Sequence, residues 1–222
     1  MSSKALYTIN FGGYDPLKEP TVVTPGWDYI VFSDTDTAAD SFDVIVVDTG
    51  LPPHLAARDC YINSHKYLYD YDVTIMIGGQ IQCATNLDDY YEKYGHGDIS
   101  MMKHPCRKDV YEEAAENKKW VGDDGRRRID RQVARYRGAG LPKNSGLWAH
   151  GVIIRHSSDR LKEFERLWWN EVCNPEYIAR DQLSFAYVLW RYGLIDVFTY
   201  DGYWDILHNE FPIYKHGSMD RL

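Results

Sequence analysis

The chain contains 222 residues and carries 25 Lys and Arg against 33 Asp and Glu, which gives a formal net charge of −8. A hydrophobic fraction of 44% in a chain of this length excludes a disordered protein and fits one large domain with a sizeable core. The acidic balance argues against a protein that coats nucleic acid or anionic membrane without specificity, although a local basic patch stays compatible with it.

Apolar runs alternate with helical patterns along the first half of the chain. Strands are predicted over Lys4–Phe11, Trp27–Ser33, Asp43–Val47 and Val73–Ile77, and helices over His54–Tyr69 and Thr85–Tyr94. The third and fourth strands are almost wholly apolar, as expected of strands buried on both faces. Thr85 or Asn86 is the predicted N-cap of the second helix. This alternation predicts an α/β fold with a mostly parallel central sheet and helices on both faces.

The second half continues the pattern with more helix. Strands are predicted over Ile99–Lys103, Leu147–Arg155 and Val197–Tyr200, and helices over Lys108–Trp120, Arg126–Tyr136, Asp159–Val172 and Arg180–Arg191. For the Trp-, His- and Tyr-rich tail that follows the last strand, no element is predicted. Because no internal repeat or linker divides the chain, residues 1–222 are predicted to form one domain.

The sequence contains no signal for secretion or membrane insertion. Its first residues lack the apolar core of a signal peptide, and no run approaches the ~18 apolar residues of a membrane span. The four cysteines form no CxxC pair and have no regular spacing, so we expect reduced thiols in a cytoplasmic protein. They are Cys60, Cys83, Cys106 and Cys173.

Glycine and acidic residues follow the predicted strands at their carboxyl ends. Gly12 and Gly13 come after the first strand, Asp34 after the second and Gly78 after the fourth. The carboxyl ends of parallel strands meet at one edge of a sheet, where α/β proteins bind ligands. This edge is therefore predicted to bind a nucleotide or phosphorylated ligand, with Tyr14 available to stack on a base. An ordinary turn is an equal alternative, since the pattern is not GxGxxG.

Two Asp-x-Asp sequences are candidate cation sites. Carboxylates spaced in this way can hold a divalent cation that bridges a diphosphate, although acidic residues are also common in turns. Asp70 and Asp72 precede their strand and so belong to the opposite edge. Asp34, at a carboxyl end, is the better candidate for ligand binding.

Basic residues form three candidate anion sites. Arg58 and Lys66 stand about two turns apart in one predicted helix, so they are expected to share a face that neutralises a diphosphate. His104 and Arg107 follow a strand, as expected of an anion or acceptor loop. For Arg58 and Lys66 the alternative is a solvated basic face, and for His104 it is a buried structural histidine. The third site is the predicted helix that carries Arg128, Arg131 and Arg135 on one face.

This arginine cluster could contact the phosphate backbone of a nucleic acid, but neighbouring acidic residues favour an ordinary surface helix.

Asp181 is the second residue of the predicted helix Arg180–Arg191, and from the local pattern alone it is favoured as a helix-starting carboxylate over a catalytic one. His208 and His216, in the aromatic tail, are candidate ligands or surface residues.

Several stretches together resemble a glycosyltransferase-like family that is found in plants, bacteria and phages and was once catalogued as a domain of unknown function. They occur in the family's order between residues 7 and 190. They are YTINFGGYDPLKEP, DYIVFSD, AARDCYINSHKYLYDYDVTIMIGGQI, KHPCRKDVYEEA, GLPKNSGL, VIIR and RDQLSFAYVLW. The resemblance implies a GT-A-type nucleotide-sugar-binding sandwich. A nucleotide-sugar half of about residues 1–100 and an acceptor half of about residues 101–222 would make it up.

The resemblance also implies roles for individual residues in transfer of a sugar from a uridine-linked diphosphate to an acceptor hydroxyl. Asp181 would be the catalytic carboxylate, as a base or as a stabiliser of the transition state. The donor would contact Phe11, Gly12, Gly13, Tyr14, Asp34, Arg58, Lys66, Gly78 and Gly79. The acceptor or diphosphate side would contain His104, Arg107, Asn144, Gly146, Leu147, Arg180 and Gln182.

One departure from the family pattern concerns the metal. Family members usually have an Asp where this chain has Gly78, and that Asp is the expected ligand of Mn²⁺ or Mg²⁺. The enzyme is then metal-independent, or another carboxylate or His216 contributes to a metal site, or the chain is an inactive relative. We expect activity, because Asp181 and the basic residues Arg58, Lys66 and Arg107 are present.

Two kinds of molecule are candidates for the acceptor. One is a hydroxymethylated base in phage DNA, whose backbone the arginine helix would hold and whose target base would leave the stack. The other is a glycan, lipid-linked sugar or protein hydroxyl. Either suits a cytoplasmic enzyme of a bacterium or of a phage-infected cell. A non-catalytic nucleotide-sugar- or partner-binding relative is the competing interpretation, which the Gly78 departure supports.

Overall fold

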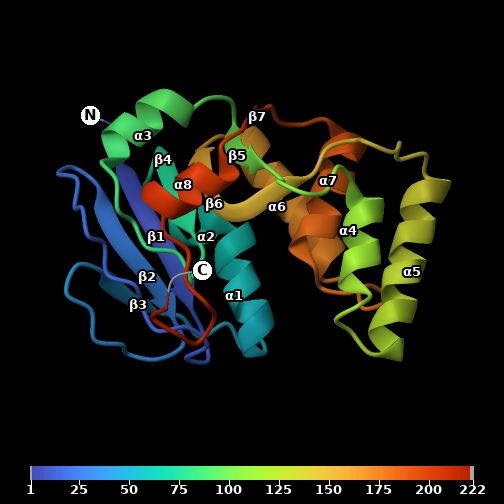
Figure 1. Ribbon diagram of the computed structural model, residues 1–222, viewed down its shortest axis with the longest axis horizontal. Helices are drawn as coiled ribbons and strands as arrows, with labels where there is room; N and C mark the ends of the chain where they lie inside the picture. The colour runs from blue at the N-terminus through green and yellow to red at the C-terminus, as the bar shows by residue number, and fades with distance from the viewer. Residues whose placement is uncertain (1, 221–222) are drawn as a thin grey trace.

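The computed structural model describes residues 2–220, which form a single mixed β-sheet with helices packed on both faces (Figure 1). Within these residues the strands follow the order β3-β2-β1-β4-β6-β5-β7 across the sheet. The strands are β1 Lys4–Asn10, β2 Asp28–Ser33, β3 Asp43–Val46, β4 Val73–Ile77, β5 Ile99–Lys103, β6 Trp148–His156 and β7 Val197–Tyr200.

The helices lie between the strands along the chain. They are α1 Pro53–Ile62, α2 Ser64–Tyr67, α3 Leu87–Tyr94, α4 Val110–Asn117, α5 Asp123–Gly138, α6 Asp159–Val172, α7 Asp181–Tyr192 and α8 Tyr203–Asn209. Helix α3 begins at its predicted N-cap, because the Asn86 side chain accepts hydrogen bonds from the amides of Asp88 and Asp89. No helix in the described part of the chain is long and apolar enough to cross a bilayer.

The sheet is parallel except at β6. Strand β1 pairs in parallel with β2 and β4, β2 with β3, and β5 with β7, whereas β6 runs antiparallel to β4 and β5. The prediction of a mostly parallel α/β sheet is therefore confirmed. Because β6 is reversed, its amino end lies beside the carboxyl ends of β4 and β5. The carboxyl ends of the other six strands and the amino end of β6 thus lie at one edge of the sheet, which we call the functional edge.

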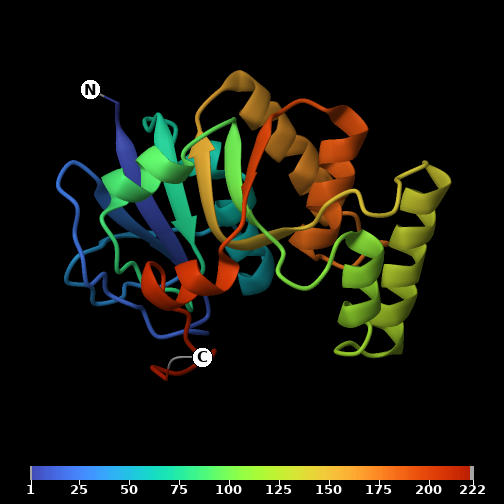
Figure 2. The same cartoon turned by 45° about the horizontal axis from the view of Figure 1, so that its top comes forward.

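Two apolar layers cover the faces of the sheet. The side chains of Tyr7, Met76 and Ile153 point to the layer formed by α1, α6 and α7. The neighbouring residues on the same strands point to the opposite layer, which includes α3 and α8. Figure 2 shows α3 and α8 in front of the sheet with α1 behind it. Helices α4 and α5 stand beyond the sheet, at the end far from β3 (Figure 1).

Strand β3 differs from its prediction. It was expected to be buried on both faces, but it is the edge strand of the sheet and pairs only with β2 among the described residues. Ile45 and Val46 are accordingly 38% and 54% exposed. An apolar run indicates a strand but does not report its neighbours, so the sequence pattern could not separate an edge strand from a central one.

Two helical predictions also need correction. The single helix predicted over His54–Tyr69 is divided at Asn63, whose backbone leaves the helical region at φ −93° and ψ 47°. The aromatic tail, for which no element was predicted, contains α8. This helix forms because Ile206 and Leu207 pack into the apolar layer that covers the sheet, and its stability therefore depends on tertiary contacts. The four cysteines, all within the described residues, are free thiols, as predicted.

Candidate active site

The first part of the site is the turn after β1. The backbone amide of Gly12 donates a hydrogen bond of 2.8 Å to Asp34 Oδ2, so the structure brings together the ends of β1 and β2 as the parallel order predicts. Gly12 and Gly13 have φ values of 68° and 60°, a conformation that favours glycine. The other carboxylate oxygen of Asp34 is buried and has no hydrogen-bond partner among the described residues. Its hydrogen-bonding capacity is therefore unused by the described residues.

The two glycines after β4 differ in how much room they have. The amide of Gly78 donates to the carbonyl of Gly151, which ties the end of β4 to β6. A Cβ atom at Gly78 would have 3.6 Å to its nearest neighbour, so a side chain fits there. At Gly79 the Cβ atom would lie 2.9 Å from the carbonyl oxygen of Ile9. Close approach of two backbones therefore requires glycine at position 79 only.

Asp181 forms the centre of the site. It is the first residue of α7 and borders a cavity of about 270 Å³ at the functional edge. Its Oδ2 atom lies 2.7 Å from His150 Nδ1, and its Oδ1 atom lies 3.8 Å from Arg58 Nε. The same His150 nitrogen lies 2.7 Å from the Tyr61 hydroxyl. The cavity wall comprises Ile9, Ala57, Arg58, Tyr61, Met76, His150 and Asp181.

The charges around Asp181 keep it ionised. Burial by itself raises the pKa of this carboxyl, but the hydrogen bond and electrostatic interaction with His150, followed by the charge of Arg58, lower the pKa well below its ordinary value. Burial and the nearby Asp181 raise the pKa of Tyr61, whose hydroxyl therefore stays neutral. A fixed negative charge thus borders the cavity near neutral pH.

His150 and Tyr61 were not predicted from the sequence. His150 is a polar residue between apolar side chains near the start of β6, and this was the one signal that pointed to it. Tyr61 gave no such signal, because an aromatic residue in an amphipathic helix is usually part of the core.

Lys66 does not share a face with Arg58, so that prediction is wrong. The helix ends at Ile62, and the chain turns at Asn63 before α2 begins. Lys66 Nζ lies 3.0 Å from the carboxylate of Asp59 and 5.8 Å from the centre of the Trp169 ring. Arg58 instead turns towards Asp181. The two cations therefore have separate carboxylate partners.

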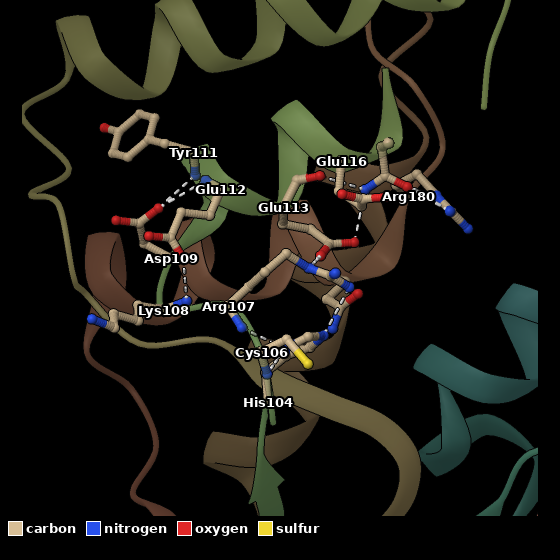
Figure 3. Close-up of polar contacts among 12 residues, drawn as sticks. His104, Cys106, Arg107, Lys108, Asp109, Tyr111, Glu112, Glu113, Glu116 and Arg180 are labelled. Carbon is tan, nitrogen blue, oxygen red and sulfur yellow. Dashed lines mark hydrogen bonds and ion pairs between the residues drawn. The ribbon is translucent and has the colours of Figure 1, made fainter. Parts of the chain in front are cut away.

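A chain of polar contacts follows β5 (Figure 3). His104 Nδ1 accepts hydrogen bonds from the backbone amides of Cys106 and Arg107. Burial and the positive charge of Arg107 lower the pKa of His104, so its imidazole is neutral near pH 7. The Arg107 guanidinium forms an ion pair with the buried carboxylate of Glu113 on α4.

This chain continues from α4 to the start of α7. Glu113 Oε1 accepts a hydrogen bond of 2.7 Å from Asn117 Nδ2. The oxygen of the same amide accepts from Arg180 Nε at 2.9 Å. Arg180 immediately precedes Asp181, so the loop after β5 and the Asp181 site are connected through buried polar side chains. The sequence analysis identified Arg107 and Arg180 as site residues, but not Glu113 and Asn117 of α4, which connect them.

The predicted acceptor residues border a second cavity of about 580 Å³. Asn144 adopts a left-handed φ of 57°, and its amide donates to Asp109 Oδ2 at 2.7 Å. Gly146 has a φ of 99°, a conformation that favours glycine, and a Cβ atom there would lie 2.9 Å from the Trp148 ring. The lining comprises Lys103, His104, Pro105, Cys106, Arg107, Lys108, Asn144, Gly146, Leu147, Trp148 and Thr199.

Two predicted residues lie outside this lining. Gln182 donates from Nε2 to the carbonyl of Trp148 at 2.8 Å, which fixes the start of β6 against α7. Arg180 borders a third cavity, of about 550 Å³, together with Arg58 and Arg128. The structure thus does not bring all of the predicted acceptor residues to one cavity.

Five of the six arginines of α5 are paired with carboxylates. Arg128 lies 2.8 Å from Asp124, Arg131 lies 3.6 Å from Glu176, and Arg135 lies 2.6 Å from Glu171. Arg126 and Arg127 pair with Asp123 and Asp124. The helix is therefore a largely neutralised surface, as the alternative to nucleic-acid binding predicts.

The described residues do not make a metal site from protein ligands alone. His216 Nδ1 lies 3.1 Å from Asp15 Oδ2, and the amide of Gly217 donates to the same carboxylate. Within residues 2–220 no group of three or more His, Cys, Asp or Glu side chains is arranged to hold a cation. Gly78 adds no ligand at the end of β4. The His216–Asp15 pair therefore falls short of a complete coordination set.

The sheet, its two helical layers and the cavities along one edge define a GT-A-like α/β fold. Residues 84–210 match the family described as TOD1/MUCI70, glycosyltransferase-like domain. The match covers more than half of the chain, so the protein belongs to this family. It includes the His104–Arg107 loop and Asp181, whereas Gly12 and Asp34 precede it. None of the curated proteins matches the chain.

Proposed function

We propose that the protein transfers a sugar from a nucleoside diphosphate donor, linked to uridine, to an acceptor hydroxyl. Membership of a glycosyltransferase-like family supports the general class. The observation that carries the proposal is the cavity in which Asp181, Arg58 and His150 meet Ile9 at the end of β1. Gly12 and Asp34 follow on the same edge of the sheet. The proposal therefore rests on a carboxylate and an arginine at one cavity, with the Gly12–Asp34 turn on the same edge of the sheet.

The donor's nucleoside is assigned to the turn after β1. The unpartnered Asp34 oxygen is suited to accept a hydrogen bond from an N–H group at the edge of uracil. Tyr14 is 66% exposed beside this turn and offers a ring face for stacking. Gly12 and Gly13 allow close backbone approach. The diphosphate would then extend towards Arg58.

The reacting centre is assigned to Asp181. Transfer forms a bond between the acceptor oxygen and the anomeric carbon, and the bond from that carbon to the diphosphate breaks. The nucleoside diphosphate leaves with the electron pair, and the proton of the acceptor hydroxyl passes to an oxygen of the leaving diphosphate. Positive charge develops on the sugar ring during this exchange, and the Asp181 carboxylate is suited to stabilise it.

For the acceptor we propose a hydroxyl-bearing glycan held in the 580 Å³ cavity beside His104 and Arg107. Trp148 supplies an aromatic surface and Lys103 and Lys108 supply positive charge at its wall. Hydroxymethylated DNA is the second candidate, and the arginine cluster of α5 favours it. The ion pairs of these arginines with carboxylates weigh against it. Binding of DNA should weaken steeply as the salt concentration rises, and this dependence would distinguish a DNA acceptor from a glycan.

The first experiment is calorimetry and thermal unfolding with UDP, GDP and their sugars, each with Mn²⁺, Mg²⁺ or EDTA. A ligand at 100 times its dissociation constant adds roughly 2.7 kcal/mol to the free energy of unfolding. Asp34→Asn is expected to weaken UDP binding at least about tenfold. Asp36→Asn, in the same turn, is the matched control and should leave binding unchanged. No binding of any nucleotide would refute the donor assignment.

A second experiment separates an enzyme from a binding protein on the same fold. Asp181→Asn should abolish turnover while the variant still binds UDP. Equal turnover in the variant and the wild type would refute a catalytic role for this carboxylate. Release of UDP is the expected product, whereas release of pyrophosphate would indicate a nucleotidyltransferase. Gly78→Asp should leave a metal-independent enzyme unimproved, and a large gain with Mn²⁺ would show that the cation is needed.

A further inference from the structure

The surroundings of His150 carry an inference that rests on the proposed function and extends it. The His150 side chain is about nine-tenths buried, with 10% of its surface exposed. Its ring lies edge-on to Trp168 and to Phe185, with centroids 5.6 and 5.3 Å away. The same Trp168 donates a hydrogen bond of 3.0 Å from Nε1 to the backbone carbonyl of Asp181. One aromatic cluster therefore holds the imidazole ring and the backbone of the carboxylate residue.

The contacts of the ring also determine where its proton lies. Nδ1 is 2.7 Å from Asp181 Oδ2, a distance that requires a proton between a ring nitrogen and a carboxylate. Nε2 is buried and has no hydrogen-bond partner within residues 2–220. The imidazole therefore engages the protein through its Nδ1–H group. The hydroxyl of Tyr61 also lies 2.7 Å from Nδ1.

We propose that His150 is a positioning residue, which holds the Asp181 carboxylate in one orientation and as the anion. Oδ2 is occupied by His150, so Oδ1 is the oxygen left to face Arg58 and the cavity. Asp181 then acts as a fixed negative charge beside the anomeric carbon rather than as the acceptor of the proton. This agrees with the lowered pKa of Asp181, since a weakly basic carboxylate gives little general-base assistance.

Two variants of His150 test the proposal against a matched control. His150→Leu removes the Nδ1–H donor, whereas His150→Asn places an amide N–H at nearly the same position. His156→Leu is the control, because this histidine lies at the other end of β6 and contacts the Tyr91 hydroxyl instead of a carboxylate. Calorimetry with UDP reports donor binding, and UDP release from UDP-glucose with water as acceptor reports turnover. Thermal unfolding reports folding.

The expected result is a split between binding and turnover. His150→Leu should bind UDP within about threefold of the wild type, while kcat falls roughly 10- to 100-fold. His150→Asn should recover part of this loss, and His156→Leu should keep wild-type turnover.

The dependence of kcat/KM on pH should also change in His150→Leu. The groups that face Asp181 are His150 on β6 and Arg58 and Tyr61 on α1, and His104 after β5 interacts electrostatically with His150.

When the Nδ1–H donor is lost, the buried carboxylate becomes easier to protonate, so the acidic limb of kcat/KM should move to higher pH in His150→Leu. Equal kcat and an unmoved limb in His150→Leu and His156→Leu would overturn the proposal. Loss of UDP binding in a folded His150→Leu protein would also overturn it, since His150 would then be a donor-binding residue. If the wild type binds no UDP, the proposed function fails instead.

A further measurement applies if His150→Leu does not fold. NMR of the wild-type protein with ¹⁵N-labelled histidine should show a strongly deshielded ring proton on Nδ1 of His150, which disappears in Asp181→Asn. An unchanged signal in Asp181→Asn would overturn the proposal.

Discussion

Removing the buried carboxylate of Glu165 is expected to cost about 3–5 kcal/mol of the free energy of unfolding. Glu165 on α6 is fully buried, and its Oε1 atom lies 3.2 Å from Nε of Arg155, which is 1% exposed. Ser64 donates to the same carboxylate at 2.8 Å, and His65 Nδ1 lies 2.6 Å from it. Glu165→Ala therefore leaves the Arg155 guanidinium buried without its counter-charge. A loss of this size is a large part of the 5–15 kcal/mol typical of a domain.

Urea unfolding followed by circular dichroism measures this loss, provided that the slope with denaturant is unchanged. Glu163→Ala is the matched control on the same helix, because Glu163 pairs with Arg166 at the surface and both side chains are about half exposed. The control should stay within about 0.5 kcal/mol of the wild type. If Glu165→Ala lies within about 1 kcal/mol of Glu163→Ala, the buried ion pair does not hold α6 against β6.

Three further predictions concern the edge of the sheet and the surface. Gly79→Ala should lower the free energy of unfolding by about 1–3 kcal/mol, because its Cβ atom would meet a backbone carbonyl at 2.9 Å, whereas Gly78→Ala has room; equal thermal unfolding of the two would contradict this. Asp109→Ala removes the cap of α4 and should cost about 1–2 kcal/mol in urea; no loss would refute the capping role. Arg128→Glu combined with Arg131→Glu should leave turnover within about threefold, and a salt-dependent loss of DNA binding would favour the DNA acceptor instead.

Local patterns in the sequence were sufficient for most of the fold. The predicted strands over Val73–Ile77 and Val197–Tyr200 and the helix over Asp159–Val172 have the observed boundaries. Each has a periodicity or an apolar run that its own residues specify. The meeting of Gly12 and Asp34 was also predictable, because the carboxyl ends of parallel neighbours must lie at one edge.

The end of the predicted helix over His54–Tyr69 and the place of β3 were not predictable from such patterns. After the helix break at Asn63, Ser64 and His65 contact the distant Glu165, and the edge position of β3 follows from which strand pairs with which. Both depend on partners that are distant in the sequence or on the sheet as a whole. Local propensity is a weak guide where such contacts decide the outcome.

The sequence by itself determined the α/β class, the order of most elements and the acidic residue at the start of α7. Only the tertiary structure decided what Asp181 contacts. It brought His150 from β6 and Arg58 from α1 to the two oxygens of that carboxylate, across sequence separations that no local pattern encodes. The physical reason is that hydrogen bonds and ion pairs depend on distance in space. Residue spacing along the chain therefore predicts a carboxylate near a sheet edge, but not the charges that set its orientation and ionisation.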